Sequence, residues 1–114
     1  MNTNPEPLTP AVFYILLALS LHQRHGYDIM KQVEKDSHGK IQMGPGTLYG
    51  SIKRMLKSGL VEEVDNPEDE RRKFYRLTKR GQKNLSAEIQ RFEEIVNLAK
   101  HKKILGTLNI NLNV

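Results

Sequence analysis

The segment from Gly44 to Val61 constrains the fold of this chain most. Its apolar residues recur at a spacing that brings them together on one face of a helix. The residues of this face are Leu48, Ile52, Met55 and Leu56. Pro45 is placed to begin the helix and Gly59 to end it with left-handed geometry, and Leu60 falls where a hydrophobic contact often accompanies such a cap. The segment therefore predicts a short amphipathic helix.

The other face of this helix is polar and basic. It carries Thr47, Gly50, Ser51, Lys53, Arg54 and Lys57. Small residues let another surface approach closely and the cations attract phosphate, so this face suits the major groove of DNA. Taken alone, a basic face is as often a solvated helix surface, and the rest of the chain has to decide between the two interpretations.

Length and charge limit the classes of protein to which the chain can belong. Its 114 residues allow one domain with a modest core. A formal net charge of +5 favours an anionic partner, although a basic balance separates nucleic acid from a membrane surface only weakly. There are no cysteines, which excludes disulfides and thiolate metal sites.

One strongly apolar run occupies residues 11–21. It is shorter than the about 20 residues that a bilayer span needs, and it lacks the basic start and the cleavage site of a signal peptide. We therefore predict a buried core helix in a cytoplasmic protein without a membrane partner. Thr9 can cap this helix and Pro10 fits its first turn. Because the helix is apolar nearly all round, both of its sides should be covered, which hints at a second subunit.

Weaker sequence patterns predict the structure of the segments around these two. Residues 1–8 are polar and contain two prolines, which predicts a loose arm. A turn over 22–26 should lead into a second helix that stops near Gly39. Its buried face is expected to consist of Tyr27, Ile29, Met30 and Val33. Residues 40–43 could pair as an edge strand.

A hairpin is predicted after the basic helix. Residues 60–64 and 74–77 have the composition of strands, and an acidic, turn-forming stretch over 65–70 separates them. The basic residues that lead into the second strand are Arg71, Arg72 and Lys73. The hairpin would therefore carry positive charge beside the basic helix, while its acidic loop should point away from phosphate.

Thr78 can cap a long final helix over about 79–103. Its apolar residues step by four, three, four and three, which is a heptad seam. The seam consists of Leu85, Ile89, Phe92, Val96 and Ala99, and Ile95 and Leu98 widen it. Such a seam most often packs against another copy, so we predict a homodimer; the alternative is a helix folded back on its own core. The tail over 105–114 alternates like a strand, but a frayed terminus competes with that interpretation.

This order of elements describes a mainly α fold with a small β-hairpin, namely a winged helix-turn-helix followed by one long C-terminal helix. The predicted organisation is an arm over 1–8, the DNA-binding domain over 9–80, a dimerisation helix over 81–104 and a tail over 105–114. The chain resembles the PadR family of transcriptional regulators. The resemblance is carried by the apolar first helix and by residues 25–29, 46–55, 58–61 and 72–81, in that order. Many members of the family carry proline where this chain has Gly50.

The resemblance implies a dimeric repressor of the short form, which binds an inverted repeat in double-stranded DNA and is released by a small aromatic or drug-like effector or another signal. We predict that the DNA contacts come from Thr47, Tyr49, Ser51, Lys53, Arg54, Lys57, Arg71, Arg72 and Lys73. An effector pocket would be lined by Phe13, Leu17, Phe92, Ile95, Val96 and Ala99. A closed dimer core without a pocket is the alternative.

No pattern in the chain indicates catalysis. Of the four histidines only His22 and His25 are close in sequence, and no third ligand stands near them, so no metal site is expected. There is no nucleophile–base pattern and no phosphate-cradling glycine loop, so we predict a non-enzyme without cofactors. The competing hypotheses are a winged-helix module that binds proteins without reading DNA, and a non-specific nucleic-acid binder.

Overall fold

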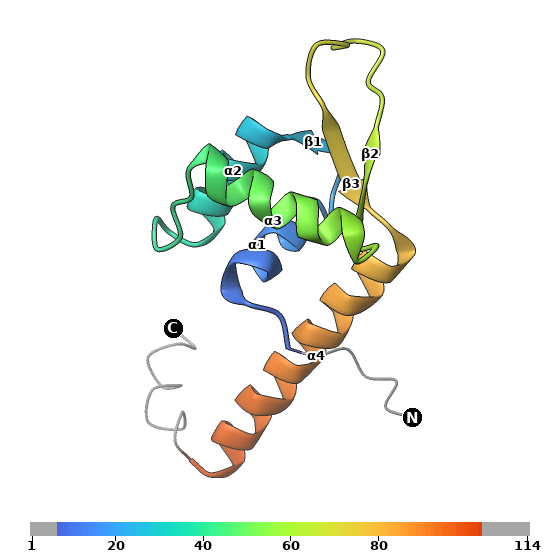
Figure 1. The fold of residues 1–114 in the computed structure, drawn as a ribbon. Coiled ribbons are helices and arrows are strands. Elements are labelled where there is room, and N and C mark those ends of the chain that lie inside the picture. The colour runs from blue at the N-terminus through green and yellow to red at the C-terminus, as the bar shows by residue number, and fades with distance from the viewer. Residues whose placement is uncertain (1–6, 104–114) are drawn as a thin grey trace.

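The structure, a computed structural model, describes residues 7–103. Its helices are α1 (Pro10–Ala18), α2 (Gly26–Asp36), α3 (Pro45–Lys57) and α4 (Lys79–His101), and its strands are β1 (Arg24–His25), β2 (Val61–Val64) and β3 (Phe74–Leu77). The β2–β3 hairpin projects from one end of the molecule and α4 from the other (Figure 1). The predicted winged helix-turn-helix with one long C-terminal helix is confirmed. The predicted tail, and all but the end of the predicted arm, lie outside the described residues.

The third strand of the sheet, β1, lies where the sequence predicted a turn. The order of the sheet is β1-β3-β2 with antiparallel pairing, and Arg24 and His25 of β1 lie opposite Tyr75 and Phe74 of β3. The predicted edge strand over 40–43 does not form, because this segment connects α2 to α3. There the Ser37 hydroxyl accepts a hydrogen bond from the amide of Ile41 at 2.9 Å, so a side chain takes the place of a strand partner.

Arg24 ties β1 to the two helices that flank it. Its side chain is almost fully buried, and its Nε donates to the carbonyl of Ala18 at 2.6 Å. Its Nη1 donates to both carboxylate oxygens of Asp28, at 3.0 and 3.1 Å. A buried guanidinium is stabilised only when it is paired in this way. Arg24 therefore fixes the end of α1 against the start of α2.

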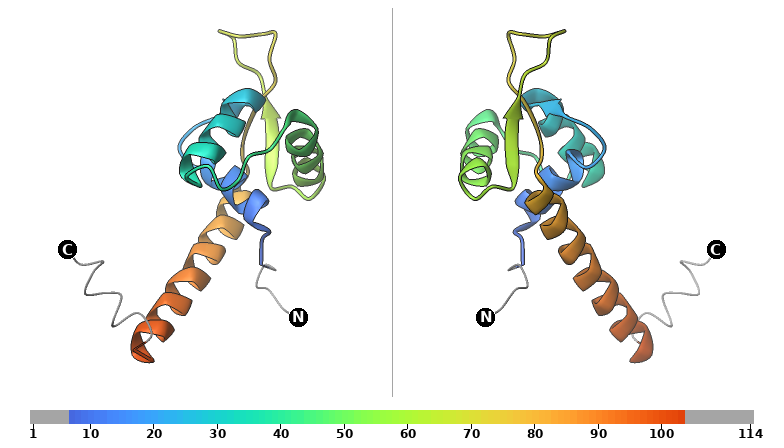
Figure 2. Two further views of the ribbon diagram at one scale, coloured as in Figure 1. Left: turned by 90° about the vertical axis from the view of Figure 1, so that its left-hand side faces the viewer. Right: turned by 90° about the vertical axis from the view of Figure 1, so that its right-hand side faces the viewer.

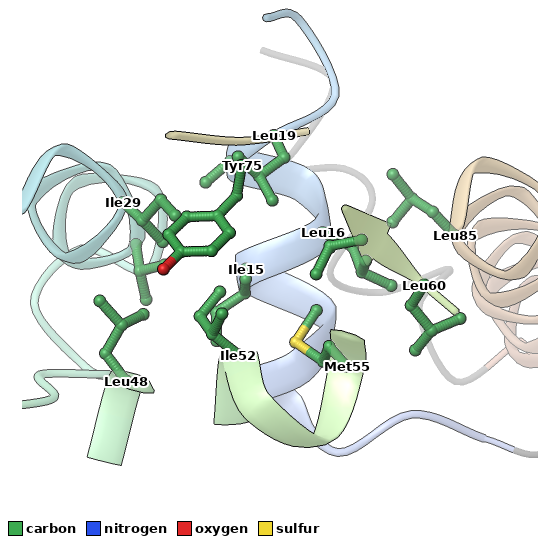
Figure 3. Close-up of a cluster of buried hydrophobic side chains, with 13 residues drawn as sticks. Ile15, Leu16, Leu19, Ile29, Leu48, Ile52, Met55, Leu60, Tyr75 and Leu85 are labelled. Atoms are coloured by element: carbon green, nitrogen blue, oxygen red, sulfur yellow. The ribbon is translucent and has the colours of Figure 1, made fainter. Parts of the chain in front are cut away.

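The core lies between α1, α2, α3 and the sheet (Figure 3). The predicted face of α3 is confirmed for Leu48, Ile52 and Met55, whereas Leu56 is 37% exposed and was wrongly assigned to it. In α2 the prediction fails for Tyr27, which is 61% exposed. Tyr27 stands one turn before Lys31, whose ammonium lies 5.4 Å from its ring centre on the outer surface.

Helix α1 packs against α2 and α4 of the same chain. Ile15 and Leu16 are fully buried, while Phe13 and Leu17 are half-buried. The chain's own core therefore explains the apolar residues on the buried part of α1, and the covering of the rest by a second copy stays a prediction. None of the helices within residues 7–103 is long and apolar enough to span a bilayer.

The end of α3 and the start of α4 are joined by a set of close backbone contacts. Gly59 has a φ of +78°, and the amide of Leu60 bonds the carbonyl of Met55 at 2.9 Å, which confirms the predicted cap. Thr78 donates to the carbonyl of Gly59 and accepts from the amide of Gly81 at 3.0 Å, so it caps α4 as predicted. The position of α4 is thereby fixed relative to α3.

The first turns of α4 belong to the core, and the remainder extends away from it (Figure 2). Leu85 is buried against the chain's own core, which corrects its assignment to the intersubunit seam. Glu88 is also buried, and its carboxylate accepts from the amide of Leu8 at 3.0 Å and pairs with Arg91. The later seam residues are substantially exposed, at 39% for Ile89, 45% for Phe92 and 41% for Val96.

Candidate nucleic-acid interface

The basic side of α3 faces outward because the opposite side is held in the core. Leu48, Ile52 and Met55 are buried, whereas Lys53 and Lys57 are exposed. Thr47 and Arg54 are exposed as well. The helix thus presents cations on a rigid support, which is the arrangement that a protein needs to contact base edges in the major groove.

Ser51 is not part of this surface. Its side chain is only 3% exposed, which corrects the prediction that its hydroxyl reaches a phosphate. Instead the hydroxyl accepts a hydrogen bond from Nη2 of Arg54 at 3.3 Å. A Cβ on Gly50 would lie 3.8 Å from Nη1 of the same guanidinium. Ser51 therefore orients Arg54 along the helix rather than contacting DNA itself.

Tyr49 connects the first turn of α3 with the first turn of α2. Its ring is partly exposed, and its hydroxyl occupies the space above Gly26, where an added Cβ would lie only 2.1 Å from the hydroxyl oxygen. No L residue with a side chain could stand at Gly26 without moving this ring. The absence of a side chain at Gly26 therefore allows the close approach of Tyr49, a role that the sequence pattern did not indicate.

The cations at the base of the wing, Arg71, Arg72 and Lys73, are all exposed. Arg72 is held from two sides: its Nε lies 3.0 Å from Oδ2 of Asp69, and its Nη1 lies 2.7 Å from Nε2 of His25. Arg72 therefore spans the distance between the wing and the start of α2. Along the hairpin Arg76 pairs with Glu62 at 3.0 Å, so the acids of the wing already neutralise part of its positive charge.

A hollow of about 480 Å³ lies where the wing base, the start of α2 and the start of α3 meet. Its walls include His25, Tyr27, Tyr49, Arg72, Lys73 and Tyr75. Burial of Tyr75, together with the nearby Glu63 carboxylate and Tyr49, raises the pKa of its phenol. Sequence reasoning missed His25, Tyr27 and Tyr75 as candidates here. The block over 25–29 was visible in the sequence, but it was interpreted as the start of a helix and as part of the family resemblance, and not as a set of binding residues.

The predicted effector site is only partly assembled within one chain. Phe13 of α1 and Phe92 of α4 meet edge to face, with ring centres 5.2 Å apart. Leu17 lies elsewhere and lines a different hollow of about 420 Å³ beside Arg24 and Asp36. Ile95 is exposed on α4, as is Val96, and Ala99 is half-buried.

The chain is similar to a known protein family and to solved structures of that family. The model of the Transcriptional regulator PadR-like family matches residues 15–87. A relative from Lysinibacillus sphaericus, called Uncharacterized protein X, is 30% identical over 84 residues, which are 71% of this chain and 77% of the relative. The crystal structure of a PadR family transcription regulator from Clostridium difficile R20291 matches with a TM-score of 0.69 and 26% identity, covering 82% of this chain and 97% of that one.

A further match is PadR of Bacillus subtilis, whose crystal structure is a complex with operator DNA. It matches with a TM-score of 0.57 and 21% identity, over 66% of this chain and 44% of that one, so the likeness is one of fold. The family match spans more than half of the present chain and includes α2, α3 and the whole wing. The chain therefore belongs to the PadR-like family of transcriptional regulators.

Proposed function

We propose that this protein is a sequence-specific DNA-binding repressor that acts in the cytoplasm as a homodimer. The observation that carries the proposal is the rigid display of Lys53, Arg54 and Lys57 on the outer side of α3, next to a basic wing base. Membership of a family of transcriptional regulators supports it, as does the fold shared with a PadR protein crystallised on operator DNA.

In this proposal the cations of α3 contact different parts of the DNA. Arg54, held by the Ser51 hydroxyl, is oriented to pair with the edge of a guanine, for which arginine is the best-suited side chain. Lys53 and Lys57 neutralise phosphates, and Thr47 at the start of the helix donates to one. Phosphate contacts fix the position of the protein on the duplex, and the base contact supplies the preference for sequence.

The second copy is proposed to cover the outer part of α4. Ile95 and Leu98 are 60% and 54% exposed, and they extend the apolar strip that Ile89, Phe92 and Val96 form. A continuous apolar strip on a projecting helix marks an interaction surface. Two copies joined there would present two α3 helices, and an inverted repeat would place its half-sites about 34 Å apart.

Release from DNA is proposed to start where α4 leaves the core. A small aromatic effector would bind beside Phe92, whose ring already contacts Phe13 and remains 45% exposed. Aromatic rings favour such edge-to-face contacts with further rings. In the dimer this position would lie close to the contact between the two copies.

The test replaces Lys53 and Arg54 together by alanine. After footprinting of the region upstream of the protein's own gene, the protected duplex is titrated with each variant by fluorescence anisotropy. We expect a loss of affinity of about tenfold to a hundredfold, since a good base contact alone contributes about 1–3 kcal/mol. The matched control, Lys102→Ala with Lys103→Ala, removes the same charge at the far end of the molecule and should bind nearly as the parent does.

Each alternative function predicts a different binding result in this experiment. Unchanged binding by the α3 variant would refute the proposed surface. Absence of binding by the parent protein at low salt would favour a module that binds proteins. Equal affinity for a random duplex would favour a non-specific binder. Analytical ultracentrifugation of all variants checks that the proposed dimer persists.

A further inference from the structure

We propose that His25 holds one of two hydrogen-bond donors at a time: Arg72 of the wing in the free protein, and the amide of Asp28 at the start of α2 once Arg72 turns to DNA. In this role His25 is a positioning residue that acts on DNA binding through Arg72. The exchange on DNA rests on the proposed DNA-binding function, whereas the choice between the two donors is a property of the free protein.

Both ring nitrogens of His25 face a group that can only donate. Nδ1 lies 3.3 Å from the amide nitrogen of Asp28, where the imidazole stands in the capping position of α2. Nε2 lies 2.7 Å from Nη1 of Arg72. A neutral imidazole has one N–H and one acceptor nitrogen, so it can accept from only one of these two donors. The two hydrogen bonds are therefore mutually exclusive.

Packing fixes the orientation of the imidazole ring. His25 is half-buried, and its ring meets that of Phe74 edge to face, with ring centres 5.3 Å apart. The two residues also lie opposite each other in the pairing of β1 with β3. A half-turn of the ring would place carbon atoms where the nitrogens now stand, and neither donor would then have an acceptor. The acceptor therefore passes from one donor to the other by a change of tautomer.

Arg72 is the donor that the imidazole accepts from in the free protein. Its contact is the shorter of the two, at 2.7 Å against 3.3 Å, and a hydrogen bond from a charged donor is about twice as strong as one between neutral groups. Asp69 binds Nε of the same guanidinium at 3.0 Å and so holds it in this position. The carboxylate of Asp28 is bound to Arg24 instead. The ring proton is therefore expected on Nδ1, and the first turn of α2 lacks its side-chain cap.

The withdrawal of Arg72 changes the start of α2. In the proposed function the exposed guanidinium turns to a phosphate, whose negative charge makes it a stronger acceptor than a neutral imidazole. Nε2 then has no donor, and the ring proton moves there from Nδ1 by exchange with water. Nδ1 becomes free to accept from the amide of Asp28 and cap α2. Because the next residue, Gly26, lies against the hydroxyl of Tyr49, the exchange links the wing to the contact between α2 and α3.

The test determines the tautomer of His25 by NMR. Long-range ¹⁵N–¹H correlation spectra distinguish a protonated ring nitrogen from an unprotonated one, and they are recorded at about pH 8, where imidazole is ordinarily neutral. We expect the proton on Nδ1 in the parent and on Nε2 in Arg72→Met, because methionine cannot donate. The matched control Arg71→Met removes the same charge at the neighbouring exposed position and should keep the proton on Nδ1. Hydrogen exchange of the Asp28 amide should be about two- to tenfold slower in Arg72→Met than in the parent, because the amide gains a hydrogen bond.

The same spectra are then recorded with the footprinted duplex bound. In the complex the ring proton of the parent should lie on Nε2, as it does in free Arg72→Met. A parent that binds the duplex and keeps the proton on Nδ1 would refute the exchange.

The outcomes separate this proposal from the proposed function. A ring proton on Nε2 in the free parent, on Nδ1 in Arg72→Met, or on Nε2 in Arg71→Met would refute the exchange while the proposed function stands. If the parent does not bind DNA, the proposed function and the exchange on DNA both fail. Circular dichroism checks that the variants fold, and the spectrum of the free parent, which needs no variant, decides alone if Arg72→Met does not.

Discussion

Substitution of Gly81 by alanine tests how the DNA-binding unit is joined to α4. An added Cβ at this position would lie 2.0 Å from the carbonyl oxygen of Leu60 and 3.0 Å from its carbon. Both are backbone atoms at the turn between α3 and β2, so no side chain can move aside. The same carbonyl accepts the amide of Thr78 at 3.2 Å, and Thr78 caps α4 through the amide of Gly81. Relief of the clash must therefore shift α4 or strain its cap.

The expected loss of stability follows from three terms. Overpacking of a close contact typically costs about 1–3 kcal/mol. Loss of the Thr78 cap would add about 1 kcal/mol. Alanine in a helix gains back about 1 kcal/mol relative to glycine. The net expectation is a variant that is about 1–3 kcal/mol less stable, and each 1 kcal/mol lowers Tm by about 4–8 °C for a domain of this size.

Urea unfolding followed by circular dichroism measures this change. Parent and variant are compared at one protein concentration, because dimerisation would make the apparent stability depend on it. Gly50→Ala in α3 is the matched control, since its added Cβ would meet only Nη1 of Arg54 at 3.8 Å. This control should be about 0.5–1 kcal/mol more stable than the parent. If Gly81→Ala is as stable as Gly50→Ala, the proposed steric role of the Leu60 carbonyl is refuted.

Three further predictions concern the binding surface, the dimer and the alkaline stability. Gly26→Ala should displace the Tyr49 ring, whose oxygen would lie 2.1 Å from the new Cβ. The loss of the proposed contact between Tyr49 and DNA should weaken DNA binding by about tenfold in an anisotropy titration. Unchanged affinity would contradict the role of Tyr49 in DNA binding. Ile95→Asp should weaken the proposed dimer by about a hundredfold or more in sedimentation equilibrium, because an unpaired carboxylate would be buried. The raised pKa of Tyr75 means that the folded state holds a proton that the unfolded state releases, so stability should fall as pH rises above about 10. In urea titrations the free energy of unfolding of Tyr75→Phe should decrease less with rising pH than that of the parent. An identical decrease in both proteins would contradict the raised pKa of Tyr75.

The sequence could predict those parts of the fold that local chemistry decides. Pro45 and Gly59 bound α3 as expected, and Thr78 caps α4, because these signals act within one turn of the chain. The β2–β3 hairpin was predicted for a similar reason, since a polar loop joins two strand-like segments. Strand β1 was missed because it has only two residues, and its pairing with Tyr75 depends on contacts across the whole domain.

The candidate site was predictable only where exposure followed from helical periodicity. Ser51 stands three residues after Leu48 and four before Met55, so its spacing placed it on the buried side, although its polarity suggested the surface. The hollow was beyond prediction, because it combines Tyr75 from the sheet, Tyr49 from α3 and the start of α2. No sequence spacing relates these segments, and only the packing of α3 on the sheet brings them together.

The division of α4 into a buried and an exposed part links the proposed dimer to the proposed DNA surface. Leu85 lies in the core and Phe92 at its edge, while the outer strip that follows is exposed. The eleven steps from Gly81 to Phe92 span about 16 Å of helix, and this length acts as a rigid lever. Since Gly81 contacts the turn that ends α3, a rotation of α4 by about 10° at Phe92 would displace the α3 end by about 3 Å. Two such displacements in a dimer would change the separation of the two α3 helices by about 6 Å, which is slightly more than one turn of an α-helix. An effector wedged beside Phe92 would therefore need to move only one ring to disturb the fit to both half-sites.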